Sequence, residues 1–202
     1  MSVGEKKDKD MNMRRFLITT LAVALGILTG CVGVASRQPL FPENAKEVVF
    51  DTSLLGKWQE SDSTTYQVTR LDEKSYAASF EDEGKKPAMA TFQLLKVRGV
   101  SVLDVAYLDR NDPAHFRTVH FFAKIRIEGD TLHVATLASD WLKKQILATG
   151  KPVHERNRLP ESSGDEPALM LTAPSAELRK GLLPYLDRPE AYEKETELKR
   201  VK

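Results

Sequence analysis

Cysteine is almost absent from this chain, since Cys31 is the only one in 202 residues. A single cysteine cannot form an internal disulfide, so a fold stapled by disulfides is excluded. An excess of either charge is also missing, with 30 lysines and arginines against 29 aspartates and glutamates. Without a basic excess, we expect no nucleic-acid partner and no polybasic attachment to a membrane.

The signatures of several enzyme classes are missing as well. The sequence contains no Gly-x-Ser-x-Gly segment for acyl transfer, no phosphate-binding loop and no dinucleotide fingerprint. The four histidines do not have the spacing of a zinc motif; they are His115, His120, His133 and His154. We therefore expect no catalytic residue, no metal and no cofactor, and we interpret the protein as non-enzymatic.

The stretch before Cys31 has the three parts of an export signal. Arg14 and Arg15 carry positive charge, and residues 16–27 are uncharged and mostly apolar. The segment ends in Leu28-Thr29-Gly30-Cys31, which resembles the lipobox of bacterial lipoproteins. The resemblance implies cleavage between Gly30 and Cys31 and attachment of acyl chains such as palmitate to Cys31. Two or more such chains anchor a protein stably in a membrane.

The lipobox divides the chain into three parts. We expect residues 1–30 to be a signal peptide, residues 31–46 to be the lipidated cysteine and a tether, and residues 47–202 to be the folded domain. Residues 1–10 are polar and charged, unlike the start of a signal, so that Met11 or Met13 is a candidate for the true start.

The same resemblance implies a location in the bacterial cell envelope. Val32 follows the cysteine and is not acidic, which favours the outer membrane, facing the periplasm, over the inner membrane. The alternative is a plain spanning helix over residues 16–36, a length of about 20 residues that suffices to cross a bilayer. The glycines and threonine in its second half make that alternative weaker.

Beyond the tether, short segments of alternating apolar and polar residues recur at the spacing of a barrel or sandwich. The predicted strands are residues 56–60, 65–71, 75–80, 89–97, 100–107, 119–127, 131–137, 168–171 and 196–201. Helices are predicted from Ser139 or Asp140 to Gly150, and from Pro174 to about Pro184. The pattern predicts a mainly β fold with two helices (α+β): an antiparallel barrel with one helix before the last two strands and another between them. We expect the last strand to pair with the first.

The first predicted strand carries a second resemblance. Gly56-Lys57-Trp58 is similar to the Gly-x-Trp motif of lipocalins and their relatives. In that superfamily an arginine from a late strand packs across the tryptophan and closes the base of the barrel. The resemblance therefore implies a lipocalin-like barrel in which Arg200 makes a cation–π contact with Trp58.

Aromatic residues lie on most of the predicted strands, and they have two readings. They either form the wall of a ligand pocket or fill the core of a small barrel. The candidates are Tyr66, Tyr76, Phe80, Phe92, Tyr107, Phe121 and Phe122.

Two polar residues within apolar strands call for partners. Asp104 lies in strand 100–107, where a buried and unpaired carboxylate would be costly. We expect it to pair with Lys96 or Arg98 across the hairpin, or to face water. His133 alternates with apolar neighbours and is expected to face solvent.

The sequence leaves two candidate functions. The first is a membrane-anchored, non-enzymatic envelope lipoprotein that binds an apolar or amphipathic small molecule, such as a lipid or fatty acid. The second is an accessory or structural lipoprotein that contacts another envelope protein and binds no ligand.

Overall fold

The computed structural model describes residues 33–60, 64–81, 88–109, 117–149 and 169–202. The lipobox and Cys31 lie outside the described residues, as do His115 and His154. Among the described residues, no helix is long and apolar enough to span a bilayer.

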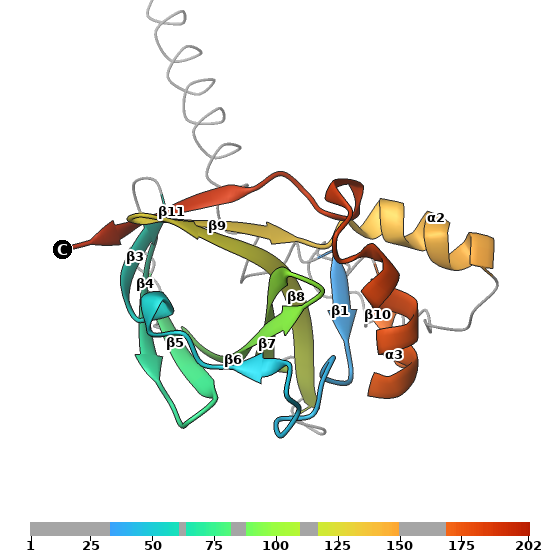
Figure 1. Ribbon diagram of the computed structural model, residues 1–202, viewed down its shortest axis with the longest axis horizontal. Helices are drawn as coiled ribbons and strands as arrows, with labels where there is room; N and C mark the ends of the chain where they lie inside the picture. The colour runs from blue at the N-terminus through green and yellow to red at the C-terminus, as the bar shows by residue number, and fades with distance from the viewer. Residues whose placement is uncertain (1–32, 61–63, 82–87, 110–116, 150–168) are drawn as a thin grey trace, which may run out of the picture.

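Eight antiparallel strands close into a barrel (Figure 1). Consecutive strands pair as hairpins from β3 to β9, and β11 inserts between β9 and β3 to complete the ring. The strands are β3 (Gly56–Glu60), β4 (Thr64–Arg70), β5 (Ser75–Glu81), β6 (Ala88–Val97), β7 (Val100–Asp109), β8 (Arg117–Glu128), β9 (Thr131–Thr136) and β11 (Thr196–Val201). The predicted mainly β, lipocalin-like barrel is confirmed, and so is the pairing of the last strand with the first predicted one.

Tight turns join the longest strands. The turn between β6 and β7 uses Arg98 and Gly99, with φ of 50° and 79°, and the turn between β8 and β9 uses Gly129 with φ of 57°. Positive φ is the conformation that two-residue hairpins require, and glycine adopts it without steric cost. These turns lie at the same end of the barrel as the start of β3.

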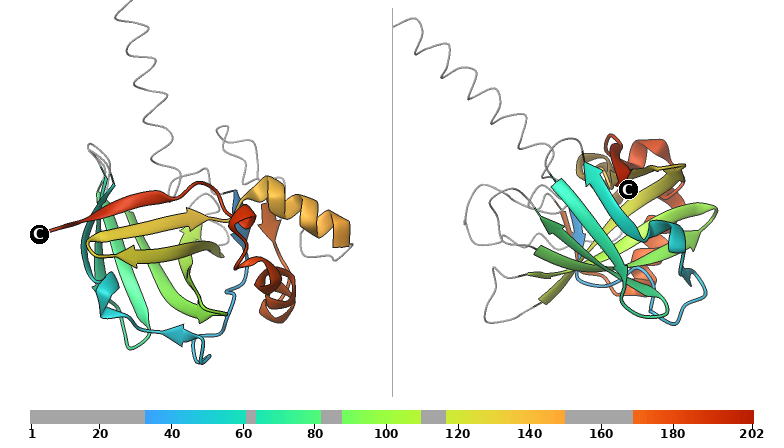
Figure 2. Two further views of the ribbon diagram at one scale, coloured as in Figure 1. Left: turned by 45° about the horizontal axis from the view of Figure 1, so that its top comes forward. Right: turned by 90° about the vertical axis from the view of Figure 1, so that its left-hand side faces the viewer.

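The helices lie outside the barrel, at one side of it (Figures 1 and 2). Helix α2 (Ser139–Thr149) precedes β10 (Leu169–Leu171), and α3 (Ser175–Leu182) separates β10 from β11, which is the order that the sequence predicts. Short 3-10 turns complete the chain: η2 (Thr52–Leu54) before β3, and η3 (Leu183–Tyr185) and η4 (Pro189–Ala191) after α3.

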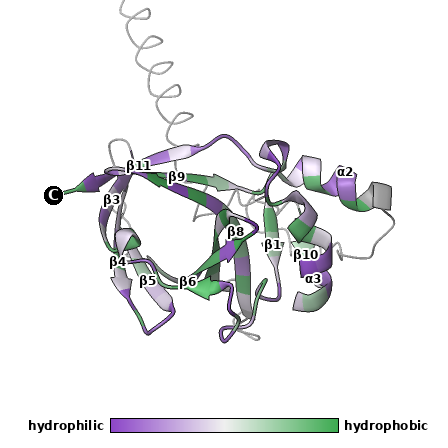
Figure 3. Ribbon diagram, in the orientation of Figure 1, coloured by the Kyte–Doolittle hydropathy of each residue, from purple (hydrophilic) through white to green (hydrophobic). Residues whose placement is uncertain are grey.

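The barrel wall has a hydrophobic core on each side. Along β6, Phe92 and Leu94 point into the barrel, whereas Leu95 and Val97 point outward to α2 and α3. This alternation of two apolar faces is expected of a strand that is covered on both sides. Hydrophobic residues likewise colour parts of β1 and β10, which lie near the helices (Figure 3).

Strand β8 is shared between the barrel and an outer extension of the sheet. Its last residues, 123–128, pair with β9, whereas His120 near its start pairs with Ser36 of β1 (Val34–Ser36). Strand β1 then pairs in parallel with β10. The predicted strand around residues 168–171 therefore exists, but it extends the sheet outside the barrel.

The predicted tether is wrong for the residues that the structure describes. Residues 33–46 include β1, and the side chains of Val34, Leu40 and Phe41 are buried against the outer core. Strand β2 (Val48–Val49) follows and pairs with β6. The sequence conceals this, because a strand of three residues shows no period and its partners are far away in the chain.

Candidate functional site

Trp58 closes one end of the barrel, which we call the closed end. Its side chain is 0% exposed, and its indole Nε1 donates a hydrogen bond to the carbonyl oxygen of Leu54 at 2.9 Å. The guanidinium carbon of Arg200 lies 4.1 Å from the centre of the Trp58 ring. The structure thus brings together the two residues named by the lipocalin resemblance, one from β3 and one from β11.

The Arg200 side chain also ties the chain before β3 to the barrel. Its Nη1 and Nη2 donate hydrogen bonds to the carbonyl oxygens of Leu55 and Ser53 at 2.7 and 2.6 Å. Gly56 makes room for it, because a Cβ at that position would lie 2.9 Å from Nη1, and the φ of 121° disfavours any other residue. The glycine of the motif is thereby explained by close approach.

A stack of three aromatic rings lies near the start of β5, next to the turn that joins β4 to β5. Tyr76 is 0% exposed and lies parallel to Phe50 on one side and Phe92 on the other, with ring centres 4.6 and 4.7 Å away. The Tyr76 hydroxyl accepts a hydrogen bond from the amide of Asp51 at 2.6 Å, and burial raises the pKa of this phenol. The segment before η2 is therefore held by an aromatic and a polar contact together.

Side chains that face the barrel axis are buried over the same range as those of the outer core. Inside the barrel, exposure runs from 0% at Trp58 and Tyr76 to 8% at Tyr66, and in the outer core from 0% at Leu95 to 9% at Ala173. The inner core is therefore a well-covered wall of aromatic and aliphatic side chains.

Most of the predicted pocket residues lie on the inner side of the barrel. Tyr66, Tyr76, Phe80 and Phe92 belong to the inner core. Tyr107 and Phe121 are half-buried and share the inward-facing register of their strands. Phe121, however, packs against Ala35 of β1 and Met170 of β10 and not in the inner core. Phe122 is a correction: it packs in the outer core with Val102, because adjacent residues of a strand point to opposite faces.

The inner face of β3 and β4 also carries polar side chains that sequence reasoning missed: Glu60, Thr64 and Tyr66, here called the interior polar group. Glu60 is 6% exposed, and the Tyr66 hydroxyl donates a hydrogen bond to its Oε2 at 3.0 Å. Burial raises the pKa of the Glu60 carboxyl above its usual range, and the Tyr66 hydrogen bond offsets part of that rise. Alternation along the strands could have predicted this placement. Glu60 lies two residues from Trp58 and Thr64 two residues from Tyr66, and residues two apart on a strand share a face.

Asp104 has partners other than those predicted. It is 3% exposed on the outer face of β7, and its Oδ1 lies 2.7 Å from His120 Nδ1. Its Oδ2 accepts a hydrogen bond from the amide of Leu40 at 2.8 Å. The expected pairing with Lys96 or Arg98 is wrong, because the segment around Leu40 covers this face of the barrel and brings its own donor.

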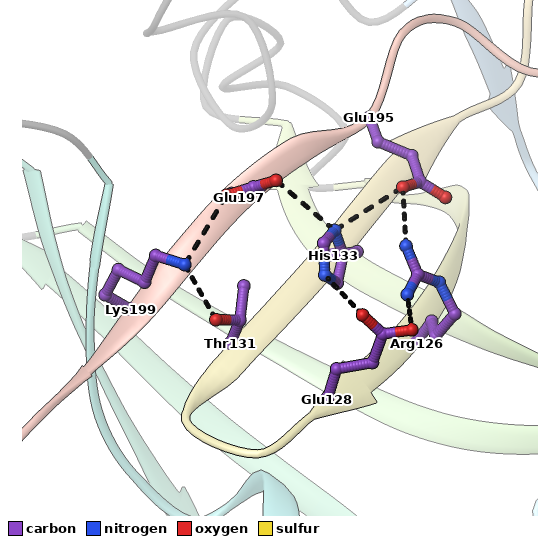
Figure 4. Close-up of polar contacts among 7 residues, drawn as sticks. All are labelled: Arg126, Glu128, Thr131, His133, Glu195, Glu197 and Lys199. Carbon is purple, nitrogen blue, oxygen red and sulfur yellow. Dashed lines mark hydrogen bonds and ion pairs between the residues drawn. The ribbon is translucent and has the colours of Figure 1, made fainter.

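His133 lies on the outer face of the barrel among carboxylates (Figure 4). Its ring nitrogens are 3.6 Å from Glu128 and 3.4 Å from Glu195, and the side chain is only 11% exposed. Arg126 pairs with the same two glutamates and lowers the pKa of Glu128 through a hydrogen bond. The cluster is therefore a network of surface ion pairs that holds β11 against β9 and β8. In the described part of the chain, no three His, Cys, Asp or Glu side chains form a metal site.

A groove outside the barrel is rich in cationic side chains. It lies between α3, the turn that joins β6 to β7, and the segment before β2, and Glu47 is the one acid among its lining residues. Its basic residues are Lys46, Lys96, Arg98, Arg179 and Lys180.

No family model, curated protein or solved structure matches this chain. The functional argument therefore depends on the barrel itself: one closed end, an aromatic and aliphatic interior, and a polar group on the inner wall.

Proposed function

We propose that this protein is a lipid-anchored, non-enzymatic envelope protein whose barrel binds an apolar or amphipathic small molecule of the lipid or fatty-acid class. The observation that supports this most strongly is the inner wall, where aromatic and aliphatic side chains surround a buried threonine hydroxyl, that of Thr64, which has no hydrogen-bond partner among the described residues.

An apolar ligand would gain contacts with the inner wall and remove its own apolar surface from water. Trp58 and Arg200 close one end, so that a ligand would enter from the other. The inner wall is mostly aromatic and aliphatic with a few polar groups, which is the usual composition of a ligand site.

The anchor would be an acylated Cys31. Since β1 begins at Val34, only two residues separate Cys31 from Val34, a span of at most about 10 Å. The barrel would therefore be held next to the bilayer surface, and a ligand taken from or delivered to the membrane would have a short path.

Native mass spectrometry tests the binding function. Residues 32–202 contain every contact of the described structure, and they would be exported to a bacterial periplasm and purified without detergent. We expect a discrete added mass that is released on denaturation. A bare polypeptide mass, together with no uptake of added lipid, would contradict the proposal.

The alternative is an accessory lipoprotein that contacts another envelope protein, and the cationic groove favours an acidic partner for it. Against it, large apolar side chains are sparse on the described surface, where only Leu71 and Met89 are strongly exposed. Stable docking surfaces usually have a larger apolar patch. We therefore place ligand binding first.

A further inference from the structure

The interior polar group occupies a defined level of the barrel. Glu60 lies two residues beyond Trp58 on β3, which places it about 7 Å farther from the closed end. In the register of β3 and β4, Glu60 is paired with Thr64, and Trp58 is paired with Tyr66. Two oxygen-bearing side chains thus stand beside each other on the inner wall, one level above the tryptophan.

Among the described residues, few polar partners face Glu60 and Thr64. The bond from Tyr66 occupies one oxygen of Glu60, and no cationic side chain of the described residues lies within 4 Å of the carboxyl. The hydroxyl of Thr64, which is 4% exposed as a residue, is buried and has no hydrogen-bond partner. The great majority of buried polar groups in proteins are hydrogen-bonded, so the Thr64 hydroxyl calls for a partner that the described residues do not supply.

The side-chain oxygens of Glu60 and Thr64 determine which ligand head group would fit beside them. A carboxylate accepts hydrogen bonds and does not donate, and the hydroxyl of Thr64 accepts as well as donates. A ligand head group that donates hydrogen bonds satisfies both, and a positively charged one also compensates the buried negative charge. A second carboxylate at this place would bring like charges together, which is unfavourable.

We infer that the barrel takes an alkyl chain with an amine or alcohol head group, which donates to Glu60 and Thr64, and that it discriminates against the free carboxylate of a fatty acid. The inference rests on the proposed function and narrows its ligand class. The chain of such a ligand would contact the aromatic inner wall, and its head group would lie at the level of Glu60.

Three probes of equal chain length test this selectivity: dodecylamine, 1-dodecanol and laurate. Each would displace the fluorescent apolar probe N-phenyl-1-naphthylamine from residues 32–202 at pH 7. We expect dodecylamine to bind about tenfold or more tighter than laurate, with 1-dodecanol between them, because a hydrogen bond to a charged group has about that effect on affinity.

The substitution Glu60→Gln keeps the side-chain shape and an acceptor for Tyr66 but removes the charge. We expect the preference for dodecylamine over laurate to disappear, while the affinity for N-phenyl-1-naphthylamine stays unchanged. Glu177→Gln is the matched control, because Glu177 lies on α3 outside the barrel with its side chain 55% exposed. If Glu60→Gln does not fold, Thr64→Val replaces it, with a smaller loss of amine affinity expected.

The outcomes separate the two proposals. If no probe binds, including N-phenyl-1-naphthylamine, the proposed ligand-binding function is overturned. If N-phenyl-1-naphthylamine binds but laurate binds as well as dodecylamine, or neither substitution changes the order of affinities, the ligand class inferred here is wrong while the binding barrel stands.

Discussion

Replacing Trp58 with alanine tests whether the closed end holds the barrel together. The indole is 0% exposed, donates to Leu54 at 2.9 Å and lies under the guanidinium of Arg200 at 4.1 Å. Truncation of a buried tryptophan costs about 3–5 kcal/mol through lost burial and the cavity left behind. The carbonyl of Leu54 would also lose its donor, and Arg200 would lose its ring contact. We expect Trp58→Ala to lower the free energy of unfolding by about 4 kcal/mol.

Urea unfolding followed by circular dichroism measures the effect without depending on tryptophan fluorescence. Trp141→Ala is the matched control, because this second tryptophan is only partly buried, on α2 against Tyr185. We expect it to cost less than half as much. A loss below about 1 kcal/mol for Trp58→Ala, or equal losses for the two variants, would refute the role of Trp58 in closing the barrel.

Three further predictions concern the anchor, the interior carboxyl and the outer face. Cys31→Ser should abolish metabolic labelling with palmitate and the acyl-dependent mass of the protein; persistence of either would show that the lipobox interpretation is wrong. The carboxyl of Glu60 has an ordinary pKa of 4.5, which burial raises in the folded protein. At low pH this carboxyl is protonated in both the folded and the unfolded state. Ionisation is then opposed in the folded state, so the free energy of unfolding should fall as the pH rises from about 4.5 through the raised pKa. Glu60→Gln should remove this part of the pH dependence. Urea unfolding at a series of pH values measures it, and an equal change of the free energy of unfolding with pH in both proteins would contradict the prediction. Asp104→Ala leaves the amide of Leu40 and the ring of His120 without their acceptor, which should cost about 2–4 kcal/mol; thermal unfolding unchanged from the parent would argue against a structural role.

The elements of the barrel were predictable because their signals are local. Strand β6 carries apolar residues on both faces, the β6–β7 turn contains Gly99 with positive φ, and α2 ends before Gly150 and Pro152. Each of these is a property of a short window of the chain. The pairing of β11 with β3 was also reachable, because a long meander removes its edges by closing on itself.

The misplaced residues have a common physical cause. Phe122 was predicted to line the pocket, but it lies on the face of β8 that also carries His120 and Lys124. The sequence does not show that this face is covered at Phe122 by the outer core. Likewise, the sequence around Asp104 does not predict that the amide of Leu40, 64 positions away, donates a hydrogen bond to its carboxylate. A contact of this kind exists only because the chain before β2 crosses the outer wall.

The sequence alone thus determined the class of fold, the order of its elements and the two residues that meet at the closed end, since alternation, turn glycines and the Gly56-Lys57-Trp58 motif are written locally. Only the tertiary structure decided which face of the wall points inward, which carboxyls are buried, and that Glu60 and Thr64 lie beside each other inside the barrel. The reason is that burial is a property of what covers a side chain, and in a barrel the covering residues come from strands far apart in the chain.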